Sequence, residues 1–359
     1  MNLITIRLAH LCENGDDSLA NDAPWRTAPT HIRKTSDRHK NLPNFLLYRK
    51  EMDVAWITQD FPAIAQAEIE TLAGKSAKQN GDLVFVEASL KGLEKRLAFT
   101  KATYTLLFSC TKKGMQKAFE AHDWKITKDF RVTTSRSPLP APLLGHFIKT
   151  KSGKQVNLHT PTNHVMVFGR DKIHVCQLHG ENDSQFEERR GRNRPAKHPT
   201  TMHPKLARAM VNLTGIKKGT FVDPMCGSGG LLLEAALLGF TCEGVDIDSR
   251  LLAKAQQNLQ YFGVSSKLTK ADSTKLNKKL SHVALDLPYG RGTTRKDLEK
   301  TYQAMISMLG RNLKGKAAIM YPHWADVPAL VKKAGLSVCY ELEAYSHRLL
   351  TRKIVIAKR

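Results

Sequence analysis

The sequence predicts an α/β protein in which an α+β domain precedes a doubly wound, mostly parallel sheet. From residue 205 onward, strand-like and helix-like segments alternate regularly, and strands that are separated by helices pair in parallel. Between residues 51 and 180 the same kinds of segment interleave irregularly, which is typical of an α+β domain. The expected parts are an N-terminal extension over 1–50, the α+β region over 51–180, a basic linker over 181–200 and the sheet domain over 201–359.

Composition indicates a globular protein with a strong excess of positive charge. The 359 residues are 41% hydrophobic and 25% charged, and at about 150 residues per domain they suggest two or three domains. The 56 Lys and Arg residues exceed the 33 Asp and Glu residues and give a net charge of +23. Because lysine and arginine that meet phosphates release counterions, a polyanion is the first partner to consider, and an acidic or purely apolar substrate surface is unfavourable.

Cysteine usage and hydropathy favour a cytoplasmic protein. No two of the six cysteines form a CxxC pair, so a zinc knuckle and a dense disulfide framework are not expected. The N-terminus lacks the long apolar stretch of a signal peptide. The most apolar window, 231–240, falls well short of the roughly 20 apolar residues of a membrane span. We therefore expect no contact with a membrane.

In the first half of the chain an irregular extension is followed by helix-like and strand-like segments in irregular order. Residues 1–50 mix Asn, Asp, Pro, Arg and Lys without a period, so we expect a mobile or loosely packed extension. Apolar spacing predicts a helix over 61–72 and another over 112–124, with a basic and then apolar run over 95–108 between them. Strands are expected over 83–88, 130–133, 155–158 and 164–168, around turns that contain Pro138, Pro140 and Pro142.

The segment 185–203 is polar and basic. Five of its residues carry positive charge against Glu187 and Glu188: Arg189, Arg190, Arg192, Arg194 and Lys197. Two interpretations stay open, a solvated surface and a basic hinge that touches nucleic acid.

The second half alternates regularly. Helices are expected over 205–212, 230–239, 250–262, 298–313 and 326–334, and strands over 220–223, 242–246, 267–271, 282–285, 317–321, 337–345 and 353–357. The last two strands have no helix between them, so they should form a hairpin with one antiparallel member.

A glycine-rich turn, FVDPMCGSGG over 221–230, directly follows the first strand of this domain and opens a helix. Its pattern is neither the GxGxxG dinucleotide fingerprint nor a P-loop. An acid at the strand end, Asp223, and the free N–H groups of a helix start suit a ligand with both an ammonium and a carboxylate, as in S-adenosyl-L-methionine. The candidate cofactor-binding residues here are Asp223, Cys226, Gly227, Ser228 and Gly229. The alternative is a turn that serves packing alone.

Acids also end the next three strands. Asp246 is placed to bind ribose hydroxyls, with Ile247 beside it, whereas Asp248 is expected to cap the following helix. Asp272 could accept from an adenine amine, and Asp286 lies where the fourth strand leaves the sheet. Four acids at successive strand ends predict one site along the carboxyl edge of the sheet.

Four motifs in order, FVDPMCGSGG, GVDID, KADS and DLPYG, resemble those of class I S-adenosylmethionine-dependent methyltransferases, which have a Rossmann-like fold. DLPYG resembles the (D/N)PPY motif of enzymes that methylate exocyclic amines. Segments 194–215 and 345–359 are similar to archaeal and eukaryotic tRNA guanine-N2 methyltransferases that act on guanosine 10. Residues 52–180 are more weakly similar to that family's N-terminal half, which holds a THUMP RNA-binding domain, through RLAFTKATYTLLF and QVNLHTPTNHVMVF.

The resemblance implies that Asp286, Leu287, Pro288 and Tyr289 are the catalytic residues. Two acceptors, Asp286 Oδ and the Leu287 carbonyl, would localise the lone pair of the guanine N2 amine, and no metal is needed. Leu287 replaces the first proline of the motif but keeps the carbonyl, and Pro288 stiffens the turn. Tyr289 would stack on the base, or alternatively would be a packing residue.

The resemblance also implies a tRNA substrate and a small zinc-binding activator subunit of methyltransferases as a partner. Candidate RNA contacts are the arginines Arg189, Arg190, Arg192 and Arg194 and the loop 291–295. Two alternatives remain: another RNA or DNA exocyclic-amine methyltransferase, and a non-catalytic RNA-binding subunit with a methyltransferase fold.

Overall fold

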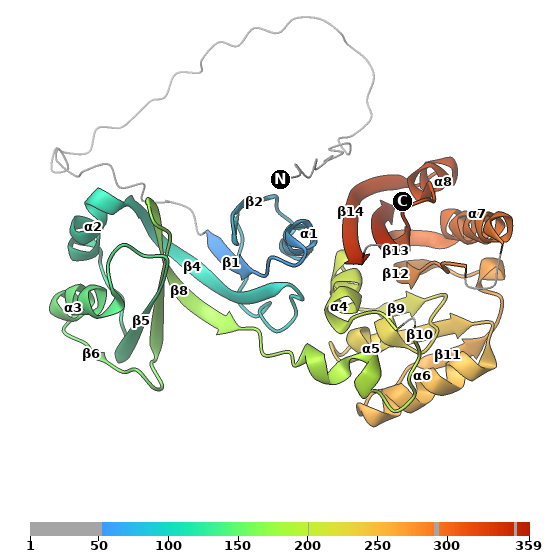
Figure 1. The fold of residues 1–359 in the computed structure, drawn as a ribbon, viewed down its shortest axis with the longest axis horizontal. Coiled ribbons are helices and arrows are strands. Elements are labelled where there is room, and N and C mark those ends of the chain that lie inside the picture. Colours follow the sequence, from blue (N-terminus) through green and yellow to red (C-terminus); the bar gives the residue numbers. More distant parts are fainter. Residues whose placement is uncertain (1–51, 200, 291–293, 348–349) are drawn as a thin grey trace, which may run out of the picture.

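The computed structural model describes residues 52–199, 201–290, 294–347 and 350–359, so the expected extension over 1–50 and most of the 291–295 loop lie outside the described residues. The described chain forms two bodies, each built around one sheet, that lie side by side along the long axis of the molecule (Figure 1). The N-terminal body holds an eight-stranded sheet and the C-terminal body a seven-stranded sheet.

The N-terminal sheet has the strand order β2-β3-β1-β4-β8-β7-β5-β6. Its strands are antiparallel neighbours except β5, which runs parallel to β6 and β7. The elements are β1 (Asp53–Ile57), α1 (Pro62–Ala73), β2 (Ala77–Asn80), β3 (Leu83–Val86), β4 (Thr100–Thr111), α2 (Met115–Ala121), β5 (Asp129–Ser135), α3 (Ala141–Ser152), β6 (Gln155–Val156), β7 (Asn163–Phe168) and β8 (Lys172–Glu181).

Three differences from the sequence prediction stand out in this body. The strands β1, β2, β4 and β8 are additional to those expected, and the helix expected over 112–124 is confined to α2 after a short 3-10 turn, Lys112–Gly114. The proline-rich segment contains a turn and also starts a helix: Pro138 and Pro140 lie in the connection between β5 and α3, where Pro140 is the N-cap residue of α3. Pro142 lies in the first turn of that helix, where the absent N–H of proline costs no hydrogen bond.

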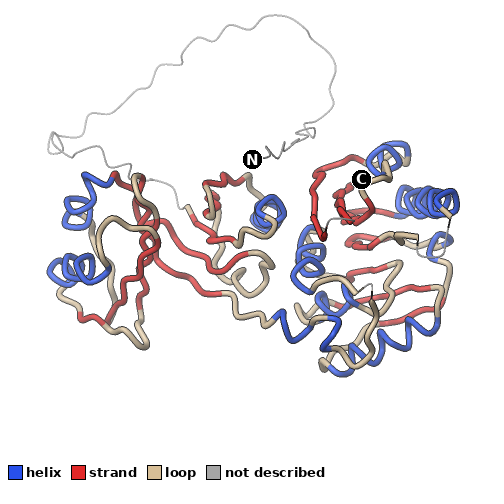
Figure 2. Tube along the Cα trace, in the orientation of Figure 1, coloured by secondary structure: helices blue, strands red, loops and turns tan. Residues whose placement is uncertain are grey.

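The C-terminal sheet has the strand order β11-β10-β9-β12-β13-β15-β14. Its elements are α4 (Pro204–Leu213), β9 (Thr220–Asp223), α5 (Gly230–Ala236), β10 (Thr241–Asp246), α6 (Ser249–Tyr261), β11 (Lys267–Lys270), β12 (Leu280–Asp286), α7 (Arg295–Asn312), β13 (Leu313–Pro322), α8 (Val327–Lys333), β14 (Ser337–His347) and β15 (Leu350–Lys358). Helices flank the sheet on both faces (Figure 2). The expected doubly wound sheet is therefore confirmed.

The strand directions are also as expected. The five strands from β11 to β13 pair in parallel, and β15 pairs antiparallel with both β13 and β14. The strand order reverses between β9 and β12, because the chain runs outward to β11 from β9 and then returns to the other side. Ligands of doubly wound sheets bind at such a switch point, outside the carboxyl ends of the strands.

Helices α1 and α4 join the two bodies. Buried apolar residues of both helices, including Ile64 and Leu206, belong to one continuous core with α5 and β9. Polar contacts run through the same junction: the fully buried Glu68 of α1 accepts from the Ala98 N–H at 2.9 Å and from Asn212 Nδ2 of α4 at 2.6 Å. Burial raises the pKa of Glu68 to about 7. The two bodies are therefore held together by a packed interface in addition to the segment that follows β8.

Two arginines of the basic linker, Arg189 and Arg194, turn inward, which corrects both interpretations of 185–203 for these two residues, whereas Arg192 and Lys197 stay exposed. The Arg189 side chain binds the carboxylate of Glu234 in α5, and Arg208 of α4 reaches the same carboxylate at 2.8 Å. Arg194 is only 1% exposed. Neither Arg189 nor Arg194 is available to RNA, and the sequence could not show this because the buried acid that attracts Arg189 comes from a distant helix.

The part of the chain described above includes no helix that is long and apolar enough to cross a membrane.

Candidate active site at the carboxyl edge of the C-terminal sheet

Three of the four predicted acids meet at the switch point. Asp223, Asp246 and Asp286 end β9, β10 and β12, which are neighbours in the sheet. The pKa of Asp223 is raised well above its ordinary value, mainly by burial and further by the negative charges of Asp246 and Asp286. Such mutual influence places the three carboxylates in one electrostatic environment, and a concentration of like charge is typical of a site built for a cationic or hydrogen-donating ligand.

The glycine-rich turn is closed by these acids. The Met225 N–H donates to Asp223 Oδ1 at 3.1 Å, and the Gly227 N–H donates to Asp246 Oδ2 at 2.8 Å. The second oxygen of Asp246 accepts from the Asp248 N–H at 2.9 Å. Asp246 therefore fixes the turn after β9 and the start of the segment after β10 at the same time.

Two glycines of the turn have different roles. Gly227 has φ +51°, and a side chain added there would meet no atom within 4 Å. Gly229 has φ +82°, and its added Cβ would lie 3.2 Å from Ala255 Cβ of α6. Gly229 therefore permits close packing of the turn on α6, whereas Gly227 keeps open a space next to Asp246 that a ligand can enter.

The other predicted cofactor residues differ in what they present. Ile247 is 71% exposed beside Asp246. The Cys226 side chain is buried, and its N–H and carbonyl form hydrogen bonds with Val245 and Gly229, so Cys226 shapes the turn from within. The Ser228 hydroxyl is likewise largely buried, 3.4 Å from that of Thr201.

Asp248 and Asp272 both cap helical turns. Asp248 accepts from the Arg250 N–H at 2.8 Å at the start of α6, so its predicted capping role is confirmed. Asp272 accepts from the N–H and the hydroxyl of Thr274, at 3.1 and 2.6 Å. Much of the hydrogen-bonding capacity of the Asp272 carboxylate is thus used locally, although about a third of its side chain stays exposed.

Asp286 lies in a cluster of buried polar atoms that lack partners. Within the described residues, Asp286 Oδ1, the Tyr289 hydroxyl and Arg352 Nε are buried and form no hydrogen bond. Asp286 Oδ2 lies 4.0 Å from Arg352 Nη1. Burial raises the pKa of Asp286 to about 6, and the Arg352 charge and the nearby Tyr289 hydroxyl oppose that rise, although Tyr289 is not in hydrogen-bonding geometry with the carboxylate. Unsatisfied buried polar groups at a sheet edge indicate a site that a polar ligand completes.

The segment after Asp286 is held rigidly. The Leu287 side chain is fully buried, and its N–H donates to the Met320 carbonyl at 2.9 Å. The Pro288 carbonyl accepts a hydrogen bond from the Tyr302 hydroxyl of α7. The ring of Tyr302 stacks on Trp324 with centroids 5.8 Å apart. The turn is therefore fixed by β13 on one side and α7 on the other.

Sequence reasoning missed Arg352 and Tyr302. Arg352 belongs to the C-terminal segment 345–359, whose family resemblance assigns no residue to the site. It reaches Asp286 because β15 lies beside β13, and this strand order cannot be read from the sequence. Tyr302 is, by its sequence position, only one residue of an expected helix.

Comparisons with known proteins identify a family model and several relatives. Residues 190–352 match the family model described as UPF0020: RMKL-like, methyltransferase domain. The chain is 31% identical over 287 residues to a tRNA (guanine(10)-N2)-dimethyltransferase of Methanothermobacter thermautotrophicus, covering 75% of this chain and 85% of the relative. It is also 31% identical over 222 residues to a protein of the same name from Pyrococcus abyssi, covering 60% of this chain and 67% of that relative.

Among solved structures, the chain is similar to TrmN from Thermus thermophilus, with a TM-score of 0.45 and 18% identity over 86% of this chain and 99% of that one. Because the Methanothermobacter relative is matched over 85% of its own length at 31% identity, this chain belongs to the tRNA (guanine(10)-N2)-dimethyltransferase family.

Proposed function

We propose that this protein transfers a methyl group from S-adenosyl-L-methionine to the exocyclic N2 of a guanosine in tRNA, at position 10. The observation that carries the proposal is the unpartnered acceptor Asp286 Oδ1, buried at the switch point beside the open glycine turn. The names of the relatives supply the substrate class and the position.

The glycine turn fits the cofactor. The space over Gly227, the acids Asp223 and Asp246, and the exposed side chain of Ile247 together present a backbone cradle, negative charge and an apolar contact. These features match a ligand with an ammonium group, ribose hydroxyls and an adenine ring. When bound, S-adenosylmethionine supplies an electrophilic methyl group.

Asp286 and the Leu287 carbonyl are placed to orient the amine. The N2 lone pair of guanine is delocalised into the ring, so two acceptors aimed at its hydrogens favour attack. The Leu287 N–H continues the parallel ladder to Met320, and in such a ladder the Leu287 carbonyl would accept from the N–H of residue 322. Residue 322 is a proline and has no N–H, so β13 leaves this carbonyl free for a ligand.

Proton removal also falls to Asp286. With a pKa of about 6, the Asp286 carboxylate is charged at neutral pH and is a stronger base than an ordinary aspartate. It can therefore take a proton from the methylated amine. Tyr289 remains the proposed stacking residue. Because the Arg352 guanidinium carbon lies 5.2 Å from the centroid of its ring, the base would use the opposite face.

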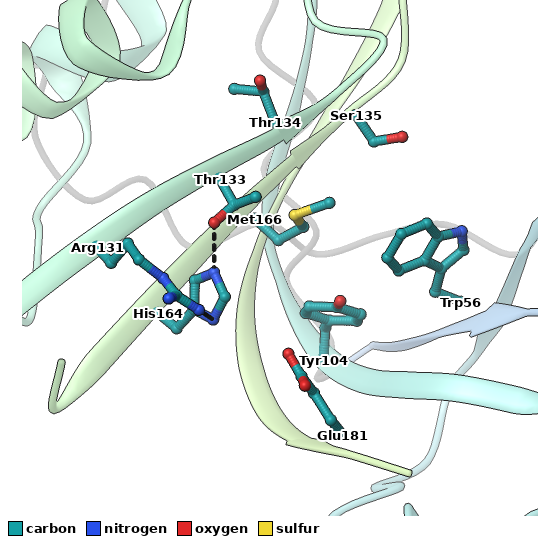
Figure 3. Close-up of a pocket in the computed structure, with 9 residues that line it drawn as sticks. All are labelled: Trp56, Tyr104, Arg131, Thr133, Thr134, Ser135, His164, Met166 and Glu181. Carbon is teal, nitrogen blue, oxygen red and sulfur yellow. Dashed lines mark hydrogen bonds between the residues drawn. The ribbon is translucent and has the colours of Figure 1, made fainter. Parts of the chain in front are cut away.

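We place RNA binding in the N-terminal body, as a THUMP-like region over 51–180. One face of its sheet carries a cavity of about 380 Å³ (Figure 3), lined by Trp56, Tyr104, Arg131, Thr133, Thr134, Ser135, His164, Met166 and Glu181. Lys101 lies 4.5 Å from the centroid of the Trp56 ring, and Arg131 Nη2 is 3.2 Å from His164 Nδ1. Aromatic rings beside cations suit stacking against unpaired bases and contact with phosphates.

Two exposed arginines outside the N-terminal body are further candidate RNA contacts. Arg192 is 70% exposed in the linker, and Arg295, 66% exposed, lies over the Trp324 ring at 4.8 Å at the start of α7. A zinc-binding activator subunit and a cytoplasmic location complete the proposal, both on the strength of the family resemblance and the sequence.

Nucleoside mass spectrometry tests the activity. Unmodified tRNA transcripts would be incubated with the protein and methyl-labelled S-adenosylmethionine, alongside a matched transcript in which guanosine 10 is replaced by adenosine. We expect N2-methylated or N2,N2-dimethylated guanosine in the first transcript and none in the second. Label on adenosine, or equal label in both transcripts, would contradict the assignment.

A further inference from the structure

A cation from the last strand lies beside the acid of the amine-binding turn. Arg352 of β15 pairs with Pro322 of β13, while Asp286 of β12 pairs with Met320 of the same strand. The Arg352 side chain is 14% exposed and extends across β13. Its Nη1 lies 4.0 Å from Asp286 Oδ2 and 4.0 Å from Met320 Sδ.

The Asp286–Arg352 ion pair lacks a direct hydrogen bond. At 4.0 Å the two groups attract through charge but do not form a hydrogen bond. Asp286 Oδ1 and Arg352 Nε both remain without partners among the described residues. A buried ion pair that served stability alone would need its remaining donors and acceptors satisfied to offset the cost of desolvation. The unfilled oxygen of Asp286 instead indicates that the pair is arranged for a ligand.

We propose that Arg352 is a positioning residue of the methyl transfer: it holds the Asp286 carboxylate in its charged form with one oxygen free for the amine, and it covers one face of Tyr289. The inference rests on the proposed function. A charged carboxylate can accept a hydrogen bond at either oxygen, whereas a protonated one carries a hydrogen at one of them and loses that acceptor.

The other groups that face Asp286 do not supply this positive charge. Asp223 of β9 is a second acid in the same environment. Tyr302 of α7 and Tyr289 of the turn are phenols whose pKa values are raised by burial and by the Asp286 charge. Burial raises the pKa of Asp286 to about 6, and the Arg352 charge opposes that rise. Arg352 thus keeps the carboxyl ionised near neutral pH.

Three variants of β15 separate this role from a structural one. Arg352→Met removes the charge but keeps an apolar side chain of similar length. Arg352→Lys keeps the charge without the planar guanidinium. Lys353→Met is the matched control, because it removes the same charge from the next residue, which pairs with Glu343 at 3.6 Å.

The first measurement needs no turnover. In full-length protein labelled with ¹³C at aspartate Cγ, the Asp286 signal is identified by its loss in Asp286→Asn, and its pH titration is followed in each variant. An opposite charge within about 4–6 Å lowers a carboxyl pKa by about 1–3 units. We therefore expect a midpoint at least about one pH unit higher in Arg352→Met, with Arg352→Lys and Lys353→Met close to wild type.

The second measurement is the single-turnover rate of tRNA methylation against pH, at saturating cofactor. Its acidic limb should move upward in Arg352→Met by the same amount as the titration, with part of the lost rate recovered at alkaline pH. An unmoved Asp286 titration in Arg352→Met, or an equal shift in Lys353→Met, overturns the inference. An inactive wild type with the expected titration shift would instead count against the proposed function alone. If Arg352→Met does not fold, the inference stands only if Arg352→Lys titrates like wild type.

Discussion

The Arg189 guanidinium forms a two-point contact with the Glu234 carboxylate, Nε to Oε1 at 2.7 Å and Nη2 to Oε2 at 3.2 Å. Glu234 is fully buried in α5, the helix that the glycine-rich turn opens. The contact therefore ties the segment that leaves the N-terminal body to the element that carries the proposed cofactor site. A charged residue of the linker thus helps to hold the two bodies together.

Glu234→Gln should destabilise the protein strongly. The substitution leaves Arg189 and Arg208 without a counter-charge in a buried position, and breaking a buried ion pair costs about 3–5 kcal/mol. Chemical denaturation measures the change in the free energy of unfolding. Glu187→Gln, which alters an acid that is 62% exposed in the linker, is the control and should change stability by less than about 1 kcal/mol. Equal effects would show that the Glu234 contacts are not structural.

Gly227→Val should abolish S-adenosylmethionine binding in a protein that stays folded. The side chain would occupy the open space over the turn and resist the φ of +51°. Gly263→Val is the matched control, because Gly263 has φ +68°, equally open surroundings and a position at the far end of α6. Both variants should lose about 1–2 kcal/mol of stability from the left-handed backbone. Calorimetry that finds wild-type affinity in Gly227→Val would remove the turn from the cofactor site.

Asp286→Ala should lower the single-turnover rate of tRNA methylation by about 10²–10³-fold, the usual cost of losing one transition-state hydrogen bond. Asp286→Asn keeps an acceptor oxygen but removes the charge. If orientation of the amine dominates, Asn retains far more activity than Ala. If charge and proton acceptance dominate, the two variants are equally slow. Cofactor affinity serves as the control and should be unchanged in both, and a wild-type rate in Asp286→Ala would exclude this residue from the mechanism.

In the unliganded protein, Asp223→Asn should reduce the loss of stability that accompanies rising pH. The same substitution should weaken cofactor binding. Folding raises the pKa of Asp223, so the native state holds more protons than the unfolded chain between the ordinary pKa of an aspartate and the raised value. Stability therefore falls as pH rises through that window. Asn cannot ionise but can still accept from the Met225 N–H. Denaturation at pH 5 and pH 8 should show a smaller decline in the variant. Parallel declines would contradict the role of the buried charge.

The C-terminal fold and the placement of three acids at the carboxyl edge of its sheet follow from the sequence alone. Helical and strand periodicity are local properties, and parallel strands bring their carboxyl ends to one edge, so the order of the segments suffices to place Asp223, Asp246 and Asp286 together. The glycine pattern likewise predicts the turn. The predicted capping role of Asp248 follows from the same local rules and is confirmed.

Contacts between distant segments depend on the folded chain. Arg352 reaches Asp286 because β15 inserts between β13 and β14, and strand order is set by packing of the whole sheet. Arg189 is interior because Glu234 is buried nearby, a pairing that charge patterns along the chain cannot show. The cavity beside Trp56 arises where β1, β4, β5, β7 and β8 of the N-terminal sheet come together, and the sequence predicts no strand at three of them, β1, β4 and β8. The periodicity of a segment predicts which of its faces is buried. Which other segments cover that face is decided by the packing of the whole chain.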